Sequence, residues 1–252
     1  MDTSSTRQAA HYDRILSDYD RHYYDPLSLE YRDRFILGPL LDGVDLSGLR
    51  VADLGCGSGE TSLSLIARFP DVEVTGFDIS PEACRRYREK VGRDCYELDL
   101  TRGHHGAETF DVAIIMGGLH HCVSDIPGTL ATVAGMLKRG GLLLMFEPNR
   151  DYALEFMRRL WYRLDHYFDA ETEAALSHDL VLRQASGAFE ARKVIYFGGP
   201  AFYLVYNSLV FRLPTGVKNV LGRPLLAVEH IFNKLPGRWP FASFLAQWVR
   251  AD

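Results

Sequence analysis

The residues best suited to chemistry lie in one short stretch, where an acid is followed by three glycines at alternate positions: Asp53, Gly55, Gly57 and Gly59. Apolar residues before Asp53 predict a short strand, and residues 60–69 predict a helix that Pro70 ends. Glycines let the backbone approach a ligand closely, and the start of a helix offers free N–H groups. The stretch therefore favours a cradle for a small ligand over a tight turn that binds nothing.

The spacing of the glycines decides which ligand the cradle suits. A dinucleotide-binding turn has the pattern G-x-G-x-x-G. Here the third glycine comes one residue early, and Glu60 stands where that motif wants it. Glu60 and Asp53 would repel a pyrophosphate but would favour a cationic ligand. S-adenosylmethionine, which carries a sulfonium and an ammonium group and no phosphate, is such a ligand.

At this point the sequence resembles the class I S-adenosylmethionine-dependent methyltransferases, whose first motif is an acid followed by G-x-G-x-G. The resemblance covers residues 45–150 and is to methyltransferases of quinone biosynthesis and secondary metabolism. In the family an acid placed like Asp99 reaches the exocyclic amine of adenine, and the next residue touches the ring. The resemblance implies S-adenosyl-L-methionine as cofactor, with these binding residues: Tyr19, Asp53, Gly55, Cys56, Gly57, Gly59, Asp78, Ile79, Asp99, Leu100, Met116 and Gly117.

Asp78 also has an argument of its own. It ends the predicted strand 72–78 and lies 19 residues after Gly59 (78 − 59), close to the spacing of an acid that binds ribose hydroxyls. A carboxylate can accept hydrogen bonds from both hydroxyls of a vicinal diol. Ser80 and Pro81 then predict the start of the next helix, so Asp78 should face the same crevice as the glycine turn.

Strands that alternate with helices predict an α/β fold with a doubly wound, mostly parallel sheet, and the resemblance implies seven strands. The strands expected after Asp78 are 94–100, 110–116, 142–147, 189–197 and 241–249, and the expected helices include 127–138 and 151–187. Ligands of such sheets bind at the carboxyl ends of the strands, which here carry Asp53, Asp78, Asp99, Met116 and Glu147. The expected domains are a helical cap (1–44), a cofactor-binding core (45–198), a helical apolar insertion (199–240) and the last core strand (241–252).

Two adjacent histidines are the predicted catalytic residues. His120 and His121 follow the fourth strand, beside the expected position of the cofactor's sulfur, and would act as general bases if the acceptor keeps its proton near neutral pH. Glu147 and His166 are the next candidates. Each of the four also fits the plainer role of a polar residue that lines a loop. No spacing of His, Cys and carboxylates predicts a metal site.

Composition limits the classes of partner. The 252-residue chain has a formal net charge of −5 and no concentrated run of Lys and Arg, which argues against nucleic acid as the main partner. Its four cysteines, Cys56, Cys84, Cys95 and Cys122, have no paired spacing, and the first residues lack an apolar signal core. These features predict reduced thiols and a cytoplasmic protein.

Residues 199–238 carry many large apolar side chains, which is unusual for a surface connection. Val194–Leu213 has the length of a membrane-spanning helix, but Gly198, Gly199 and Pro200 interrupt it. We expect a helical lid that roofs a pocket for an apolar or lipid-like acceptor. A homodimer interface, ordinary core packing and contact with an anionic membrane surface through the interspersed Arg and Lys are the alternatives.

The sequence therefore predicts an S-adenosylmethionine-dependent methyltransferase that acts on a small, partly apolar or lipid-like molecule by in-line displacement. An NAD(P)-dependent oxidoreductase is the first alternative, and Asp53 and Glu60 disfavour it. A non-catalytic binding protein that kept the fold is the second, and the intact glycine turn together with Asp78 argues against it.

Overall fold

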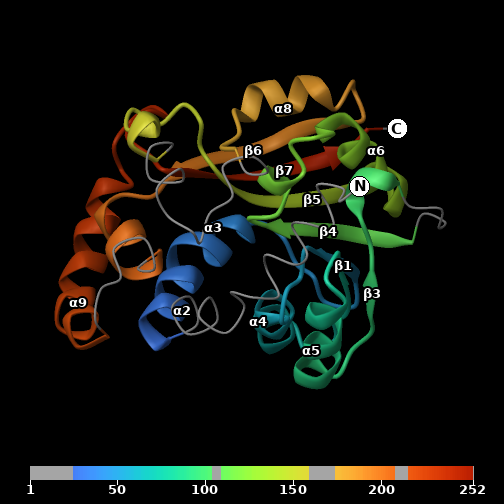
Figure 1. The fold of residues 1–252 in the computed structure, drawn as a ribbon, viewed down its shortest axis with the longest axis horizontal. Helices are drawn as coiled ribbons and strands as arrows, with labels where there is room; N and C mark the ends of the chain where they lie inside the picture. Colours follow the sequence, from blue (N-terminus) through green and yellow to red (C-terminus); the bar gives the residue numbers. More distant parts are fainter. Residues whose placement is uncertain (1–24, 104–108, 159–173, 208–214, 252) are drawn as a thin grey trace, which may run out of the picture.

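The computed structural model describes residues 25–103, 109–158, 174–207 and 215–251 (Figure 1). Within these residues the chain forms one seven-stranded sheet with the strand order β3-β2-β1-β4-β5-β7-β6. The strands are β1 Arg50–Leu54, β2 Glu73–Asp78, β3 Cys95–Glu97, β4 Phe110–Met116, β5 Leu137–Pro148, β6 Phe189–Phe197 and β7 Ser243–Arg250. The first five strands pair in parallel, and β7 is antiparallel to both of its neighbours. The predicted fold class is confirmed.

The helical elements of the same residues are α2 Pro26–Arg32, η1 Asp33–Leu37, α3 Gly38–Leu40, α4 Glu60–Arg68, α5 Pro81–Val91, η2 Leu100–Arg102, η3 Leu119–His121, α6 Ile126–Met136, α8 His178–Gln184, η4 Phe202–Tyr206 and α9 Thr215–Phe232. Ser80 caps α5 through a bond from the Ala83 N–H, and Gly92 ends it in the left-handed region, both as the sequence predicts. No helix of the described segments is long and apolar enough to cross a lipid bilayer.

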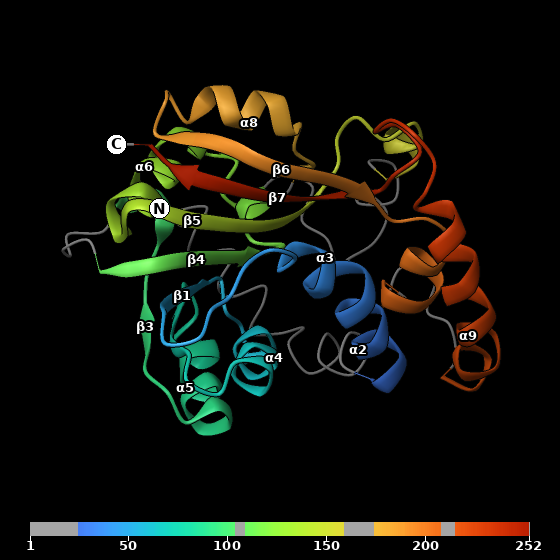
Figure 2. The ribbon, with the colours of Figure 1, turned by 180° about the vertical axis from the view of Figure 1, so that it is seen from behind.

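Helices cover both faces of the sheet, so its central strands are apolar on both sides (Figure 2). On one face, Ile114 of β4 packs with residues of α2, α3 and α4. On the other face, Ala113 and Ile115 of the same strand pack with residues of α6 and α8. This alternation explains the nearly continuous apolar run that predicts β4.

Several predicted elements have different bounds, among them the predicted strands 142–147 and 241–249, which are Leu137–Pro148 and Ser243–Arg250 in the structure. The predicted helix 127–138 ends earlier, because β5 already begins at Leu137; Gly140, with φ of 68°, lies in the irregular part of its pairing with β4. The predicted strand 94–100 is cut short because Asp99 caps η2. The single helix predicted over 151–187 is wrong: Leu176 pairs with Asn149 beside the end of β5, and α8 begins only at His178.

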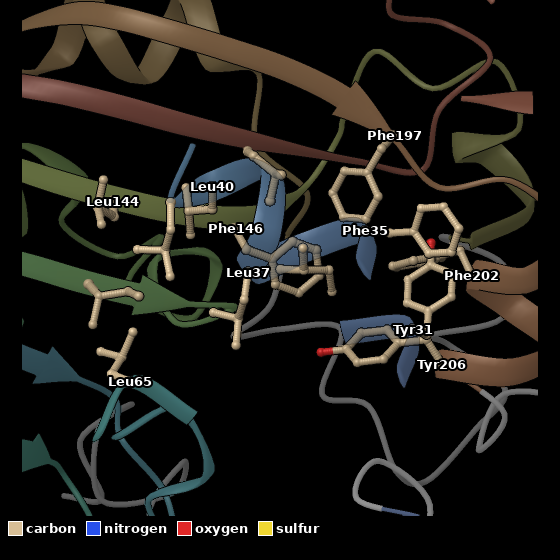
Figure 3. Packing of buried hydrophobic residues seen from close by; sticks show 14 of the residues in the cluster. Tyr31, Phe35, Leu37, Leu40, Leu65, Leu144, Phe146, Phe197, Phe202 and Tyr206 are labelled. Atoms are coloured by element: carbon tan, nitrogen blue, oxygen red, sulfur yellow. The ribbon is translucent and has the colours of Figure 1, made fainter. Parts of the chain in front are cut away.

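The cap helix α2 and the elements η4 and α9 lie beyond the sheet edge toward which β4 points (Figures 1 and 2). Aromatic side chains fill the space between them and β5: Tyr31, Phe35, Phe146, Phe202 and Tyr206 (Figure 3). The rings of Tyr31 and Tyr206 are stacked at a centroid distance of 5.3 Å. The described parts of the predicted cap and of the predicted insertion therefore pack on one another, and the division into domains stays a prediction.

Candidate functional site

The glycine turn joins β1 to α4 at the carboxyl edge of the sheet. The N–H groups of Gly55 and Cys56 both donate to the Phe77 carbonyl, at 2.8 and 3.1 Å, and this holds the turn against the end of β2. All three glycines of the turn have positive φ, which favours glycine. A Cβ on Gly59 would collide with Val91 of α5, whereas a Cβ on Gly57 would meet nothing within 4 Å. Gly59 therefore serves helix packing, whereas the space beside Gly57 is open.

Asp78 lies at the end of β2 and links the turn to α5. Its Oδ2 accepts from the Gly57 N–H and its Oδ1 accepts from the Ser80 N–H, both at 2.9 Å. These two bonds fix the orientation of the carboxylate beside the glycine turn. The predicted association of Asp78 with the glycine turn is thus present in the fold, and its ribose role stays a prediction.

Asp53, at the end of β1, is buried, and only one of its two carboxylate oxygens is hydrogen-bonded within the described residues. Its Oδ2 accepts from the Ser62 hydroxyl at 2.7 Å, but its Oδ1 has no hydrogen-bond partner among the described residues. Burial raises the pKa of Asp53 to about 6, while the bond from Ser62 and the nearby charge of Arg32 oppose the rise. A buried acceptor without a hydrogen-bond partner destabilises the fold. A cationic group of a bound ligand could donate to this oxygen and remove that cost.

Arg32, the last residue of α2, is also buried and also has one side-chain atom without a hydrogen-bond partner among the described residues. Its Nη2 donates to the Thr61 hydroxyl at 2.5 Å, whereas its buried Nη1 has no hydrogen-bond partner within the described part of the chain. A guanidinium nitrogen and a carboxylate oxygen that both lack partners fit the carboxylate and ammonium groups of an amino-acid zwitterion. The methionine end of S-adenosylmethionine is such a zwitterion, so the residues present fit this cofactor. Arg32 cannot be recognised from the sequence alone, because nothing in residues 26–32 separates a buried arginine from an exposed one.

His120 and Glu147 form a pair beside the end of β4, in which Glu147 is fully buried and His120 is partly buried. The ring Nδ1 of His120 lies 2.8 Å from Oε2 of Glu147. Three backbone N–H groups, of Gly118, Leu119 and His120, also donate to the carboxylate, at 2.7 to 3.2 Å. Burial raises the pKa of Glu147, and these N–H bonds oppose the rise. With donors around both oxygens we assign the carboxylate form to Glu147, and its partner Nδ1 then carries the proton.

The assignment leaves the other ring nitrogen of His120, Nε2, as an acceptor. Burial lowers the pKa of His120 far below its usual value, and the charge of Arg158 acts in the same direction, so the ring is neutral near pH 7. His121 lies next to it, with ring centroids 3.9 Å apart, but it is not part of the bond to Glu147. The structure thus distinguishes two adjacent histidines that the sequence analysis treats alike.

The other predicted site residues lie near the same edge of the sheet, and they make their contacts with other parts of the protein. The Gly117 N–H donates to the Phe146 carbonyl at 2.7 Å, directly after Met116. Oδ1 of Asp99 accepts from the Thr101 N–H and hydroxyl, and the Leu98 N–H beside it bonds to the Asp78 carbonyl. Leu100 packs on the core, and Ile79 is partly buried. The Cys56 side chain is buried 3.5 Å from the sulfur of Cys95, so only its backbone can face a ligand.

Tyr19 and His166 lie outside the described residues, and their predicted roles remain predictions. Among the residues that are described, no group of three or more His, Cys, Asp or Glu side chains could hold a metal ion.

Part of the chain is similar to known methyltransferases. Residues 52–143 match the family model of a methyltransferase domain. A ubiquinone biosynthesis O-methyltransferase of Azoarcus is 33% identical over 148 residues, which are 54% of this chain and 61% of the relative. A trans-aconitate 2-methyltransferase of Rhodopseudomonas palustris is 28% identical over 150 residues, which are 57% of this chain and 56% of the relative. The chain thus spans less than two thirds of the length of these curated relatives.

Similarity to solved structures extends over nearly the whole chain. A Thermotoga maritima protein described as an S-adenosylmethionine-dependent methyltransferase, possibly acting on histamine nitrogen, superposes with a TM-score of 0.65. The match covers 96% of this chain and 99% of that one at 15% sequence identity, which shows a shared fold. With the strand order and the glycine turn, these findings show that the chain has the fold of the class I S-adenosylmethionine-dependent methyltransferases, and that residues 52–143 are similar to a methyltransferase domain.

Proposed function

We propose that this protein is an enzyme that transfers a methyl group from S-adenosylmethionine to a proton-bearing oxygen or nitrogen of a small, partly apolar molecule. The observation that carries the proposal is the His120–Glu147 pair, which lies at the same strand edge as the glycine turn. The curated relatives described above act, by their names, on small molecules, and this supports a small acceptor.

The residues that would hold the donor follow from the unsatisfied groups. Arg32 Nη1 would receive the donor's carboxylate, Asp53 Oδ1 its ammonium group, and Asp78 its ribose hydroxyls. When bound, the donor supplies an electrophilic methyl group on its sulfonium. The backbone at Gly57 leaves the space that such a molecule needs.

His120 would act on the acceptor. Its neutral Nε2 would accept the proton of the acceptor's hydroxyl or amine, which raises the nucleophilicity of that atom. Burial weakens this base, and the carboxylate of Glu147 would offset the effect when the imidazolium forms. Glu147 is a positioning residue, because it holds Nδ1–H and stabilises the imidazolium that forms. Phe146 packs against Phe202 and Tyr206 next to Gly117, and these rings exclude water from this side of the site.

The test has a binding arm and a turnover arm. Calorimetry with S-adenosylmethionine and with its demethylated product should show binding, and NADH should show none. A panel of phenols, carboxylic acids and amines, screened by mass spectrometry, should yield a product that has gained one CH₂ unit. Binding of NADH in place of S-adenosylmethionine would overturn the proposal.

The role of His120 is tested with its neighbour as control. His120→Ala should lower kcat by a factor of about 10² to 10⁴, typical of a lost general base, and leave the donor Kd within about twofold. His121→Ala removes the adjacent ring and leaves the bond between His120 and Glu147 in place, so this variant should keep most of the activity. Equal losses in both variants would remove His120 from the mechanism.

A further inference from the structure

Helix α9 has its polarity reversed relative to a helix that faces water. Its buried positions recur every three or four residues, at Lys218, Gly222, Leu226 and Glu229, and two of these four are charged. Its exposed face carries large apolar side chains at helical spacing: Val217, Val220, Leu221, Val228 and Ile231. A surface helix of a globular protein normally buries its apolar stripe and exposes its charges.

The inner face is a specific contact. Lys218 Nζ pairs with Asp25 and donates to the Ser28 hydroxyl at 2.6 Å, and both partners belong to the start of α2. Glu229 accepts from the Tyr31 hydroxyl at 2.6 Å. A Cβ on Gly222 would collide with Leu27, so the two helices pack closely. The charged face of α9 is therefore fixed against α2, and the apolar face must point away from the protein.

The outer face is strongly exposed. Val220 is 75% exposed, Ile231 is 69% exposed and Trp239, shortly after the helix, is 68% exposed. The Ala153 N–H donates to the Trp239 carbonyl at 2.8 Å, so a second exposed apolar segment begins beside that tryptophan. Its exposed members are Leu154, Phe156 and Met157. Exposed apolar surface of this kind indicates contact with a partner or a membrane.

The charges around this face select the partner. Residues 215–240 contain one acid, Glu229, and it is fully buried. Arg223, His230, Lys234 and Arg238 are exposed, although the whole chain has a formal net charge of −5. Arg238 pairs with Asp179 and Asp151, whereas Arg223 and Lys234 form no ion pair with the acids of the described residues. Two copies joined through this face would bring like charges together, which disfavours a dimer.

We propose that α9, with Trp239 and residues 154–157, binds the surface of a membrane that contains anionic lipids. The apolar face would lie in the interfacial layer, and Arg223 and Lys234 would face the lipid headgroups. The inference stands apart from the proposed function, because vesicle binding can be measured without any acceptor or turnover.

Co-sedimentation with vesicles tests the proposal. The protein should pellet with vesicles of phosphatidylglycerol and phosphatidylcholine, bind pure phosphatidylcholine much more weakly, and be released by high salt. The double variant Val220→Glu, Ile231→Glu should lose about tenfold or more of this binding. Tyr96→Glu is the matched control, because Tyr96 is 55% exposed on the edge strand β3, across the molecule from α9 (Figure 1), and this variant should bind as the unmodified protein does.

Charge reversal and oligomeric state complete the test. Arg223→Glu with Lys234→Glu leaves the apolar face unchanged and should weaken binding to the anionic vesicles severalfold. Circular dichroism and thermal unfolding of each variant verify that it is folded. The proposal is wrong if the unmodified protein stays in the supernatant with anionic vesicles, or if the folded Val220→Glu, Ile231→Glu variant binds them normally. A dimer in sedimentation velocity that this double variant dissociates, without vesicle binding, would assign the face to a second copy instead.

Discussion

Two buried carboxylates, Asp53 beneath the glycine turn and Glu229 between α9 and α2, have opposite surroundings. Glu229 accepts from the Tyr31 hydroxyl and from the N–H groups of Gly199 and Ala201, at 2.6 to 2.9 Å. Asp53 accepts from Ser62, while its second oxygen has no hydrogen-bond partner among the described residues. Burial raises the pKa of both groups, so the difference lies in their hydrogen bonds.

The contrast separates structural residues from binding residues without reference to conservation. A buried charge with all its bonds made inside the chain holds two segments together. Asp53 Oδ1 and Arg32 Nη1 are buried and have no hydrogen-bond partner among the described residues, so a bound ligand could supply the missing partners. The region around Asp53 should therefore respond to changes in ligand binding, and the region around Glu229 should respond in stability.

Gly57→Val should cause the largest loss of affinity for the methyl donor, S-adenosylmethionine. Its side chain would occupy the open space beside the turn, so we expect donor affinity to fall by a factor on the order of 100 or more. Gly48→Val is the matched control, since Gly48 also has positive φ and open space around its Cβ position, but it lies outside the turn. It should show the same backbone strain and normal affinity in calorimetry. Similar losses of affinity in both variants would mean that strain, rather than occupied space, explains the effect.

Asp53→Asn should come next. The amide keeps the size of the side chain but loses the charge that would face an ammonium group, so donor affinity should fall by about 10- to 100-fold, as for a lost charged hydrogen bond. Thermal stability should hold or rise, because an incompletely paired buried charge has been removed. Calorimetry and thermal unfolding measure the two effects. A large drop in Tm with unchanged affinity would class Asp53 with Glu229.

The pH dependence of donor binding sharpens the same point. With the pKa of Asp53 raised to about 6, the free protein protonates this group below that pH, and the cation must displace the proton. Affinity should therefore fall as the pH drops from about 6.5 to 5, by up to about tenfold per unit. In the free protein the native state binds more protons than the unfolded chain between pH about 4 and 6, so stability should decrease as pH rises through that window. Asp53→Asn should abolish both trends.

Glu229→Gln should have the smallest effect on the affinity for S-adenosylmethionine, and it should lower the stability of the fold instead. The amide cannot accept from all the present donors, and one unsatisfied buried group costs about 1–3 kcal/mol. We expect a lower Tm and a donor Kd within about twofold of the original, measured by calorimetry well below the new Tm. A tenfold loss of affinity in the folded variant would show that the two regions are not independent.

Local signals explain which parts could be predicted from sequence. Asp53 and the glycine turn, Asp78 at a strand end, and the cap formed by Ser80 and Pro81 depend on neighbours within a few residues, and the structure places them as expected. Strand β6 has the predicted bounds for the same reason. The match at Asp78 concerns position, and its ligand role remains to be tested.

The misses depend on contacts between distant parts of the chain. Leu176 returns to pair with Asn149, and no periodicity within 151–187 reveals that. Arg32 is buried because α2 packs beside Thr61. Glu229 is buried against Tyr31, a residue 198 positions away in the sequence. The sequence reveals that residues 199–238 are apolar, but not that the charged side of α9 is the inner one.

Tyr31 and Arg32 are consecutive residues of α2, and this adjacency has a thermodynamic consequence. The bond from Tyr31 to Glu229, together with the ion pair between Asp25 and Lys218, holds both ends of the helix against α9. The guanidinium of Arg32 is therefore held near Asp53 before any ligand binds. The conformational entropy of ordering this arginine is lost when the chain folds, so a ligand that meets it does not bear that cost again.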